Sequence, residues 1–84
     1  MEYIMSLHAK ERIERRKISM DVLEGIIRQP DDKIEETACV WVFQKMKEND
    51  KFYLYRVYVN ICKMPPLVIT AYKTSESEKY GYKI

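Results

Sequence analysis

The chain has 84 residues, of which 46% are hydrophobic, and its 15 basic and 13 acidic side chains give a formal net charge of +2. A chain of this length folds as one domain around a single thin core, and only two glycines and three prolines exclude a disordered or low-complexity protein. The small net charge excludes attraction to nucleic acid or an anionic membrane by the field of the whole protein, so any anion site must come from local clusters of basic side chains.

The cysteines and the single histidine limit the metal chemistry of the chain. Cys39 and Cys62 form no CxxC motif and His8 is the only histidine, so we predict no zinc site, no other metal and no cofactor. Both cysteines stand among apolar residues, which is typical of buried free thiols in reduced cytoplasmic proteins; this is the expected state, and one disulfide is the alternative. No apolar run approaches the roughly 20 residues that cross a bilayer, so neither a membrane segment nor a signal peptide is predicted.

Two helices are predicted in the first third of the chain, after an irregular arm over residues 1–5. The first begins after Ser6, a good N-cap residue, and continues to about Lys17. The second begins after Ser19, another N-cap residue, and ends before Pro30, because the residue preceding a proline is disfavoured in helical geometry. Its core-forming residues are Val22, Leu23, Ile26 and Ile27.

The first predicted helix carries a basic stripe that we interpret as functional. Positions i, i+4 and i+7 lie on one side of a helix, so His8, Arg12 and Arg15 project together. Ala9 and Ile13 lie on the neighbouring side and can face a core. One stripe of this helix can therefore pack while the adjacent stripe presents an imidazole and two guanidinium groups to a ligand.

From Lys33 onward the apolar residues alternate and become β-branched and aromatic, which predicts strands. The predicted strands span residues 33–36, 38–46, 52–61 and 67–73. A polar turn is expected over residues 47–51 and a loose tail over residues 74–84. The complete prediction is a single α+β domain, residues 1–84 with a core of about 6–73, in which two N-terminal helices pack on one face of a three- to four-stranded, mostly antiparallel sheet.

The two faces of the predicted strand at residues 52–61 differ in character. The face that is the better core candidate carries Tyr53, Tyr55, Val57, Val59 and Ile61. The other face carries Arg56. Thr70 and Tyr72 of the last strand lie beside it if the registers allow, and the three residues then form one site.

Short motifs in a fixed order resemble a known family. They are His-Ala-x-x-Arg-Ile-x-x-Arg from His8, then Ile18-Ser19, Arg56-Val57 and the sequence Ile-Thr-Ala-Tyr over residues 69–72. This order resembles a small family of unknown function that belongs with the barnase, EndoU, colicin and RelE-like ribonuclease toxins. The resemblance implies a RelE-like fold of two helices and a curved antiparallel sheet, with a metal-independent RNA-cleaving site on the sheet and nearby helix.

The resemblance also implies which residues are functional. The matching positions are His8, Arg12, Arg15, Arg56 and Thr70. The chain departs from the family in the connection at residues 63–66 and in having Arg16-Lys17 where the family often has a glycine. Neither departure falls on a matched position.

RNA cleavage without a metal needs a base for the 2′-OH proton, an acid for the 5′-oxygen and cations for the charge that grows on phosphorus. His8 is the candidate acid or base, because histidine titrates near neutral pH. Arg12 and Arg56 suit bidentate phosphate contact, and Thr70 can donate to a phosphate or orient His8. The candidate RNA-binding residues are Arg15, Arg16, Tyr58, Tyr72 and Lys73.

Most of these residues also have an ordinary structural interpretation. His8 can hydrogen-bond its own backbone, and Arg12 can pair with a carboxylate such as Glu35 or Glu36. Arg56 can be a strand cation without a ligand, and Thr70 can be present for its β-propensity. The basic run over residues 15–17 can be a solvated helix end that the helix dipole favours.

The leading functional prediction is a metal-independent endoribonuclease toxin of a toxin–antitoxin or prophage system. Its expected partners are RNA and a cognate antitoxin protein. The alternative is a non-catalytic module on the same fold that binds a protein or nucleic acid. An exposed edge strand and a tyrosine-rich sheet also make a homodimer plausible.

Overall fold

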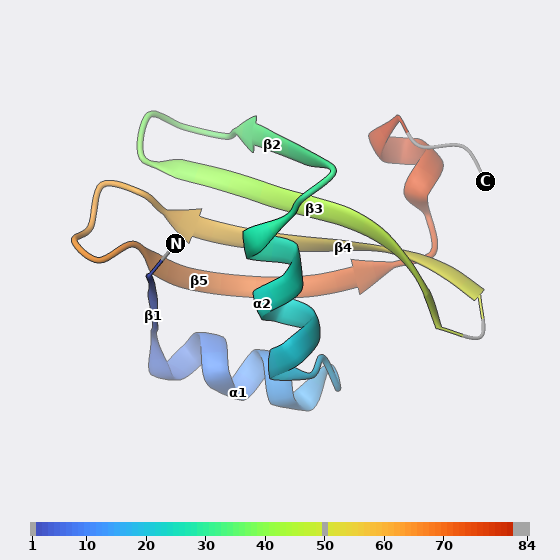
Figure 1. Cartoon of the computed structure of the whole chain (residues 1–84), viewed down its shortest axis with the longest axis horizontal. Coiled ribbons are helices and arrows are strands. Elements are labelled where there is room, and N and C mark those ends of the chain that lie inside the picture. The colour runs from blue at the N-terminus through green and yellow to red at the C-terminus, as the bar shows by residue number, and fades with distance from the viewer. Residues whose placement is uncertain (1, 50, 82–84) are drawn as a thin grey trace.

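One five-stranded sheet forms the centre of the computed structural model, which describes residues 2–49 and 51–81. The elements in chain order are β1 (Ile4–Met5), α1 (Leu7–Arg15), α2 (Met20–Arg28), β2 (Asp32–Glu35), β3 (Val40–Asn49), β4 (Lys51–Asn60), β5 (Leu67–Thr74) and the 3₁₀ helix η1 (Ser77–Tyr80) (Figure 1). The strand order is β1-β5-β4-β3-β2; β1 runs parallel to β5, and the other pairs are antiparallel. The predicted α+β class and mostly antiparallel sheet are confirmed. The sheet exceeds the predicted three to four strands because part of the expected N-terminal arm pairs with β5 as β1.

Both predicted N-caps are confirmed. The hydroxyl of Ser6 accepts a hydrogen bond from the backbone N–H of Ala9 at 3.0 Å, and the hydroxyl of Ser19 accepts one from Val22 at 3.2 Å. Each hydroxyl satisfies an N–H group that has no intrahelical partner at the start of a helix. These caps fix where α1 and α2 begin.

A Schellman motif ends α1 and turns the chain toward α2. The N–H of Ile18 donates to the carbonyl of Ile13 and the N–H of Lys17 donates to that of Glu14, both at 3.0 Å. Ile13 and Ile18 are both buried, which adds the apolar contact typical of this motif. Lys17 has a φ of 56°, the left-handed conformation that glycine adopts without steric strain.

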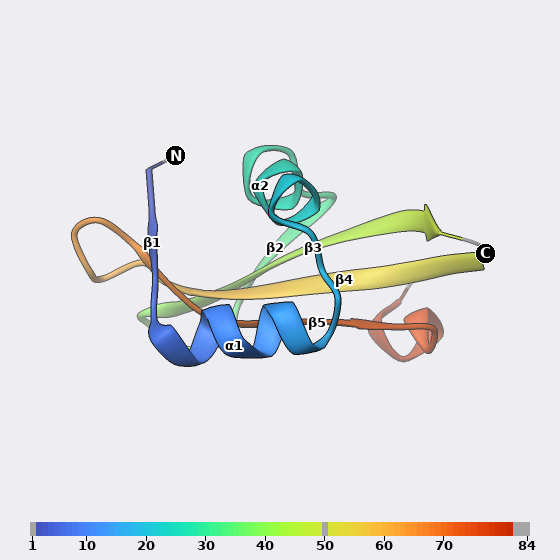
Figure 2. The same ribbon diagram turned by 90° about the horizontal axis from the view of Figure 1, so that it is seen from below.

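The two helices take different places relative to the sheet, which corrects the prediction that both lie over one face. α2 packs on β3 and β4 and covers one face, whereas α1 runs beside β5 at the sheet edge (Figures 1 and 2). The reason is that β1 pairs with β5 directly before α1, so the helix begins at that edge. The core lies on the α2 side of the sheet, and the predicted buried face of β4 is confirmed by Tyr55, Val57 and Val59.

The β3–β4 hairpin is longer than predicted. The polar residues 47–49 continue β3 instead of forming a turn, and Asn49 pairs with Lys51 at the start of β4. Asp50, the remaining residue of the predicted turn, lies outside the described residues. Backbone hydrogen bonds between the strands continue through this polar segment. Polar side chains are compatible with it because this end of the hairpin is exposed and packs against no core.

The segment after residue 73, predicted as a loose tail, is structured in its described part. β5 extends to Thr74, and η1 follows at Ser77–Tyr80. η1 lies on the side of the sheet opposite α2 (Figure 2), and its residue Ser77 is only 1% exposed. The rest of the predicted tail, residues 82–84, lies outside the described residues.

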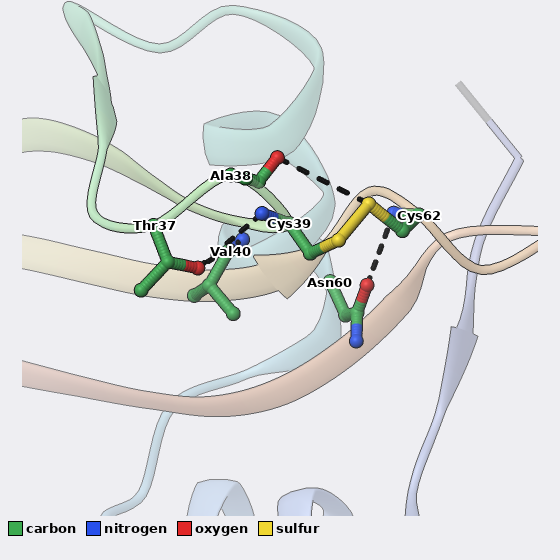
Figure 3. Close-up of a disulfide and its surroundings, with 6 residues drawn as sticks. All are labelled: Thr37, Ala38, Cys39, Val40, Asn60 and Cys62. Carbon is green, nitrogen blue, oxygen red and sulfur yellow. Dashed lines mark hydrogen bonds between the residues drawn. A yellow bond between two sulfur atoms is a disulfide. The ribbon is translucent and has the colours of Figure 1, made fainter.

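Cys39 and Cys62 form a disulfide, which corrects the prediction of buried free thiols (Figure 3). Their Cα atoms are 5.1 Å apart although 23 residues separate them in sequence. The register of the hairpin explains the contact, because Val40 at the start of β3 pairs with Asn60 at the end of β4. Cys62 is also exposed rather than buried.

Removal of the disulfide is expected to destabilise the domain. The double variant Cys39→Ser/Cys62→Ser should lower the free energy of unfolding by about 2–4 kcal/mol, because the cross-link restricts the unfolded chain. Urea unfolding followed by circular dichroism measures this difference. Dithiothreitol should reduce the wild-type stability to that of the variant and leave the variant unchanged. Equal stability of the oxidised and reduced wild type would contradict the assignment.

Replacement of Lys17 by glycine is expected to stabilise the domain. Lys17→Gly should raise the free energy of unfolding by about 0.5–1 kcal/mol, because glycine adopts the left-handed conformation without strain. Lys17→Ala is the matched control: it removes the same charge but keeps Cβ, so it should give no gain. An equal gain in both variants would assign the effect to charge and not to backbone strain.

Candidate functional site

The sheet face that points away from α2 carries a cluster around one arginine. Nε of Arg56 donates to Oε1 of Gln44 at 3.0 Å, and Nη1 donates to the hydroxyls of Tyr72 at 2.8 Å and Tyr58 at 3.2 Å. The ring centroid of Tyr80 lies 4.2 Å from the guanidinium carbon, and the Tyr80 and Tyr72 hydroxyls are 3.3 Å apart. These five residues are called the arginine–tyrosine cluster below.

The register of three strands creates this cluster. Gln44 of β3, Arg56 of β4 and Tyr72 of β5 are direct cross-strand neighbours, so their side chains lie in one row. Tyr58 lies two residues along β4 on the same face, and its ring stacks on that of Tyr72 with 6.1 Å between centroids. Tyr80 comes from η1, which follows β5 and lies on this side of the sheet (Figure 2). The register therefore confirms that Arg56 and Tyr72 lie side by side.

Arg56 is a largely buried cation whose described contacts are with neutral groups. Only 7% of the surface of Arg56 is exposed. Burial by itself lowers the pKa of Arg56, but the hydrogen bond with Tyr72 and the nearby tyrosine phenols outweigh this effect and hold its pKa above the ordinary value. The guanidinium therefore stays charged. None of its described hydrogen bonds uses Nη2.

The phenols of the cluster differ in acidity. Partial burial by itself raises the pKa of Tyr72, but hydrogen bonds with Tyr80 and Arg56 and the charge of Arg56 outweigh it, so the pKa lies below the ordinary value. The pKa of Tyr58 is raised chiefly by burial. The pKa of Tyr80 is raised chiefly by its hydrogen bond with Tyr72. Tyr72 is thus the phenol of the cluster best suited to accept a proton as phenolate.

Thr70 lies at the border between this cluster and α1. It is the cross-strand neighbour of Tyr58 and therefore lies on the same face as Arg56. Arg16, the C-cap of α1, donates from Nη1 to the hydroxyl of Thr70 at 3.2 Å and to the carbonyl of Ala71 at 2.8 Å. Arg16 thereby fixes the end of α1 at the edge of the arginine–tyrosine face.

His8, Arg12 and Arg15 are exposed on α1 and make no described contact with the cluster. On a helical projection they lie on the flank next to Arg16 and away from the buried Ile13. Because Arg16 reaches Thr70, this flank is turned to the same side of the sheet as Arg56. The proposed pairing of Arg12 with Glu35 or Glu36 is wrong, since β2 and the residue after it lie at the opposite edge of the sheet from α1.

Lys73 does not join the cluster. It pairs with Tyr55 on the face that α2 covers in part, and its Nζ lies 5.1 Å from the ring centroid of Tyr53. Strand alternation places neighbouring residues on opposite faces, so Tyr72 and Lys73 cannot serve one site on the sheet.

Sequence reasoning missed two members of the cluster. Gln44 is a polar residue inside an otherwise apolar stretch of β3, and it is 1% exposed. A polar residue in an apolar strand could have indicated a polar neighbour on the next strand, because a buried amide needs a polar partner. Tyr80 gave no such signal, because its contact with Arg56 depends on the path of the chain after β5.

The described part of the chain has neither a cluster of metal-ligating side chains nor a helix that could span a membrane. Residues 2–49 and 51–81 contain no group of three or more histidine, cysteine or acidic side chains arranged to hold a metal ion. None of the helices formed by these residues is long and apolar enough to cross a membrane.

The chain matches the model of a known protein family. A family model described as "Domain of unknown function (DUF4258)" matches residues 5–73, which include α1, α2 and all of the sheet except Ile4 of β1 and Thr74 of β5. Neither the curated proteins nor the solved structures give a significant match.

Tyr72 is expected to be the first phenol of the cluster to ionise as the pH rises. Ultraviolet titration of phenolate should show a phase below the ordinary tyrosine range that Tyr72→Phe removes and Arg56→Gln shifts to higher pH. Because the folded pKa is the lower one, the unfolded state binds more protons between the two pKa values, and stability should rise with pH across that interval. Tyr55→Phe, on the other face, should leave the phase in place. Persistence of the phase in Tyr72→Phe would contradict the assignment.

Proposed function

The chain belongs to the DUF4258 family, whose description assigns no activity, and we propose that it is a metal-independent endoribonuclease with a RelE-like fold. The observation that carries the proposal is a charged, largely buried Arg56 beside a tyrosine whose pKa is lowered. A fixed cation and a nearby base are the groups that cleavage of a phosphodiester requires. In this proposal the domain is the toxin of a toxin–antitoxin or prophage system, with RNA as substrate and an antitoxin protein as partner.

The proposed reaction begins at the 2′-OH of RNA. The phenolate of Tyr72 takes the 2′-OH proton, and the 2′-oxygen attacks the adjacent phosphorus. The bond from phosphorus to the 5′-oxygen breaks, so the products are a 2′,3′-cyclic phosphate and a 5′-OH. Arg56 stabilises the additional negative charge on the phosphate oxygens, and its Nη2 is the nitrogen not used by Gln44, Tyr58 or Tyr72.

α1 supplies the remaining protein groups in this proposal. Water protonates the 5′-oxygen as it leaves. His8 and Arg12 contact the phosphate backbone away from the reacting phosphate, because eight residues of helix, about 12 Å, separate His8 from Arg16 at the border of the cluster. Support comes from the orientation of the helix, since the contact of Arg16 with Thr70 turns this flank to the side of Arg56. Thr70 and Arg16 have a positioning role, because they hold α1 against β5.

A second candidate function is a non-catalytic binding module on the same fold. The observation that favours it is the position of Tyr80, whose ring lies 4.2 Å from the guanidinium carbon of Arg56 and helps to cover it. A permanently covered arginine would stabilise the sheet and would catalyse no reaction. The two functions differ in whether RNA is cleaved.

Purified protein is expected to cleave single-stranded RNA in the presence of EDTA. Arg56→Gln and Tyr72→Phe should each lower the initial rate by about 100-fold or more, because each removes a group that acts in the transition state. His8→Ala should lower the rate less, because His8 contacts the RNA away from the reacting phosphate. The rate of the wild type should rise with pH as Tyr72 loses its proton. Gel analysis and detection of the cyclic phosphate measure the outcome.

Two variants on the other side of the sheet serve as controls. Tyr55→Phe removes a phenol from the α2 face, and Arg28→Gln removes an exposed guanidinium that pairs with Glu24 at 2.7 Å. Both should cleave at the wild-type rate. RNA cleavage that survives unchanged in correctly folded Arg56→Gln and Tyr72→Phe would refute the proposed site, and absence of cleavage in the wild type would favour the binding module.

A further inference from the structure

A second group of basic and aromatic side chains lies on the α2 side of the sheet, at the end of the β3–β4 hairpin. Lys47 of β3, Lys51 and Tyr53 of β4, and Lys73 of β5 occupy alternating strand positions on this side. The group is called the lysine–tyrosine face. Figure 2 shows that this end of the hairpin extends beyond α2, so the helix leaves it uncovered.

Two lysines of this face have their ammonium groups near one aromatic ring, and a third lysine is its neighbour on β3. Nζ of Lys73 lies 5.1 Å and Nζ of Lys51 lies 5.4 Å from the ring centroid of Tyr53. Lys47 is the direct cross-strand neighbour of Tyr53. Tyr53 is only partly buried, so part of its surface is accessible to a ligand.

Carboxylates do not neutralise these lysines in the described part of the chain. The described ion pairs join Arg28 with Glu24 and Lys79 with Glu76. Asp31, whose Oδ2 accepts a hydrogen bond from the backbone N–H of Met46 at 2.9 Å, directly precedes β2 and so lies across β3 from Tyr53 of β4. A local positive charge therefore surrounds Tyr53 in a chain whose formal net charge is only +2.

We propose that the lysine–tyrosine face binds single-stranded nucleic acid. Proteins that bind single strands without sequence preference combine basic side chains along the backbone with aromatic rings on which bases stack. Lys47, Lys51 and Lys73 contact phosphates, and Tyr53 stacks on a base. An acidic polypeptide would use the charges but would gain nothing from stacking on Tyr53. The binding goes beyond the proposed cleavage and holds whether or not the Arg56 site turns RNA over.

The test uses a ligand that cannot be cleaved by attack of a 2′-OH. The probe is a fluorescein-labelled 2′-O-methyl oligouridylate of about 12 nucleotides, and fluorescence anisotropy is measured over a range of salt concentrations with the full chain. The triple variant Lys47→Gln/Lys51→Gln/Lys73→Gln should bind at least tenfold more weakly near 0.1 M salt, and its salt slope should be smaller by about 2, since each phosphate contact contributes roughly 0.7. Tyr53→Leu should weaken binding about tenfold and leave the slope unchanged.

The matched control removes the same charge elsewhere. Lys10→Gln/Lys17→Gln/Lys63→Gln changes exposed lysines outside this face, and it should keep the wild-type affinity within about twofold. Equal losses in the two triple variants would overturn the proposal, because binding would then follow net charge alone. Wild-type binding to labelled polyglutamate but not to the oligouridylate would also overturn it and indicate an acidic protein partner. Oligouridylate binding without cleavage of RNA would support this inference and refute the proposed endoribonuclease.

Discussion

The structure depends on keeping one charged guanidinium satisfied inside a sheet. Arg56 is 7% exposed and has exchanged most of its water for an amide and phenols. A buried cation is tolerated only where its N–H groups find acceptors, so loss of one partner is costly. The register that places Gln44, Arg56 and Tyr72 in one row is therefore an electrostatic requirement as much as a consequence of strand pairing.

The same requirement gives this face its chemistry. Burial alone would raise the pKa of Tyr72, but its hydrogen bonds with Tyr80 and Arg56 and the charge of Arg56 lower it. Burial raises the pKa of Tyr58, and the hydrogen bond with Tyr72 raises that of Tyr80. Identical side chains thus become chemically unequal because each has a different burial and different hydrogen-bond partners around one charge. η1 belongs to this arrangement, since Tyr80 completes the cluster from the end of the chain.

The two faces of the sheet use basic and aromatic residues in different ways. On the face away from α2 one arginine is enclosed by tyrosines, whereas on the α2 side the lysines near Tyr53 surround the ring and keep their charges close to solvent. Arginine has a planar set of donors that hydrogen bonds can fix, while lysine is a flexible point charge. In the two proposals, the first arrangement serves the cleavage of RNA and the second serves contact with a nucleic-acid backbone.

The sequence by itself determined the local structure: Ser6 and Ser19 cap the helices because their partners are three residues away, and alternation alone assigned the faces of β4. Tertiary structure decided the rest. Only the hairpin register brings Cys39 to Cys62, only the pairing of β1 with β5 places α1 at the edge, and only the path after β5 brings Tyr80 to Arg56. These contacts join residues that are distant in sequence. Their geometry depends on the hydrogen-bond register between strands, and the types of residue in one segment do not determine that register.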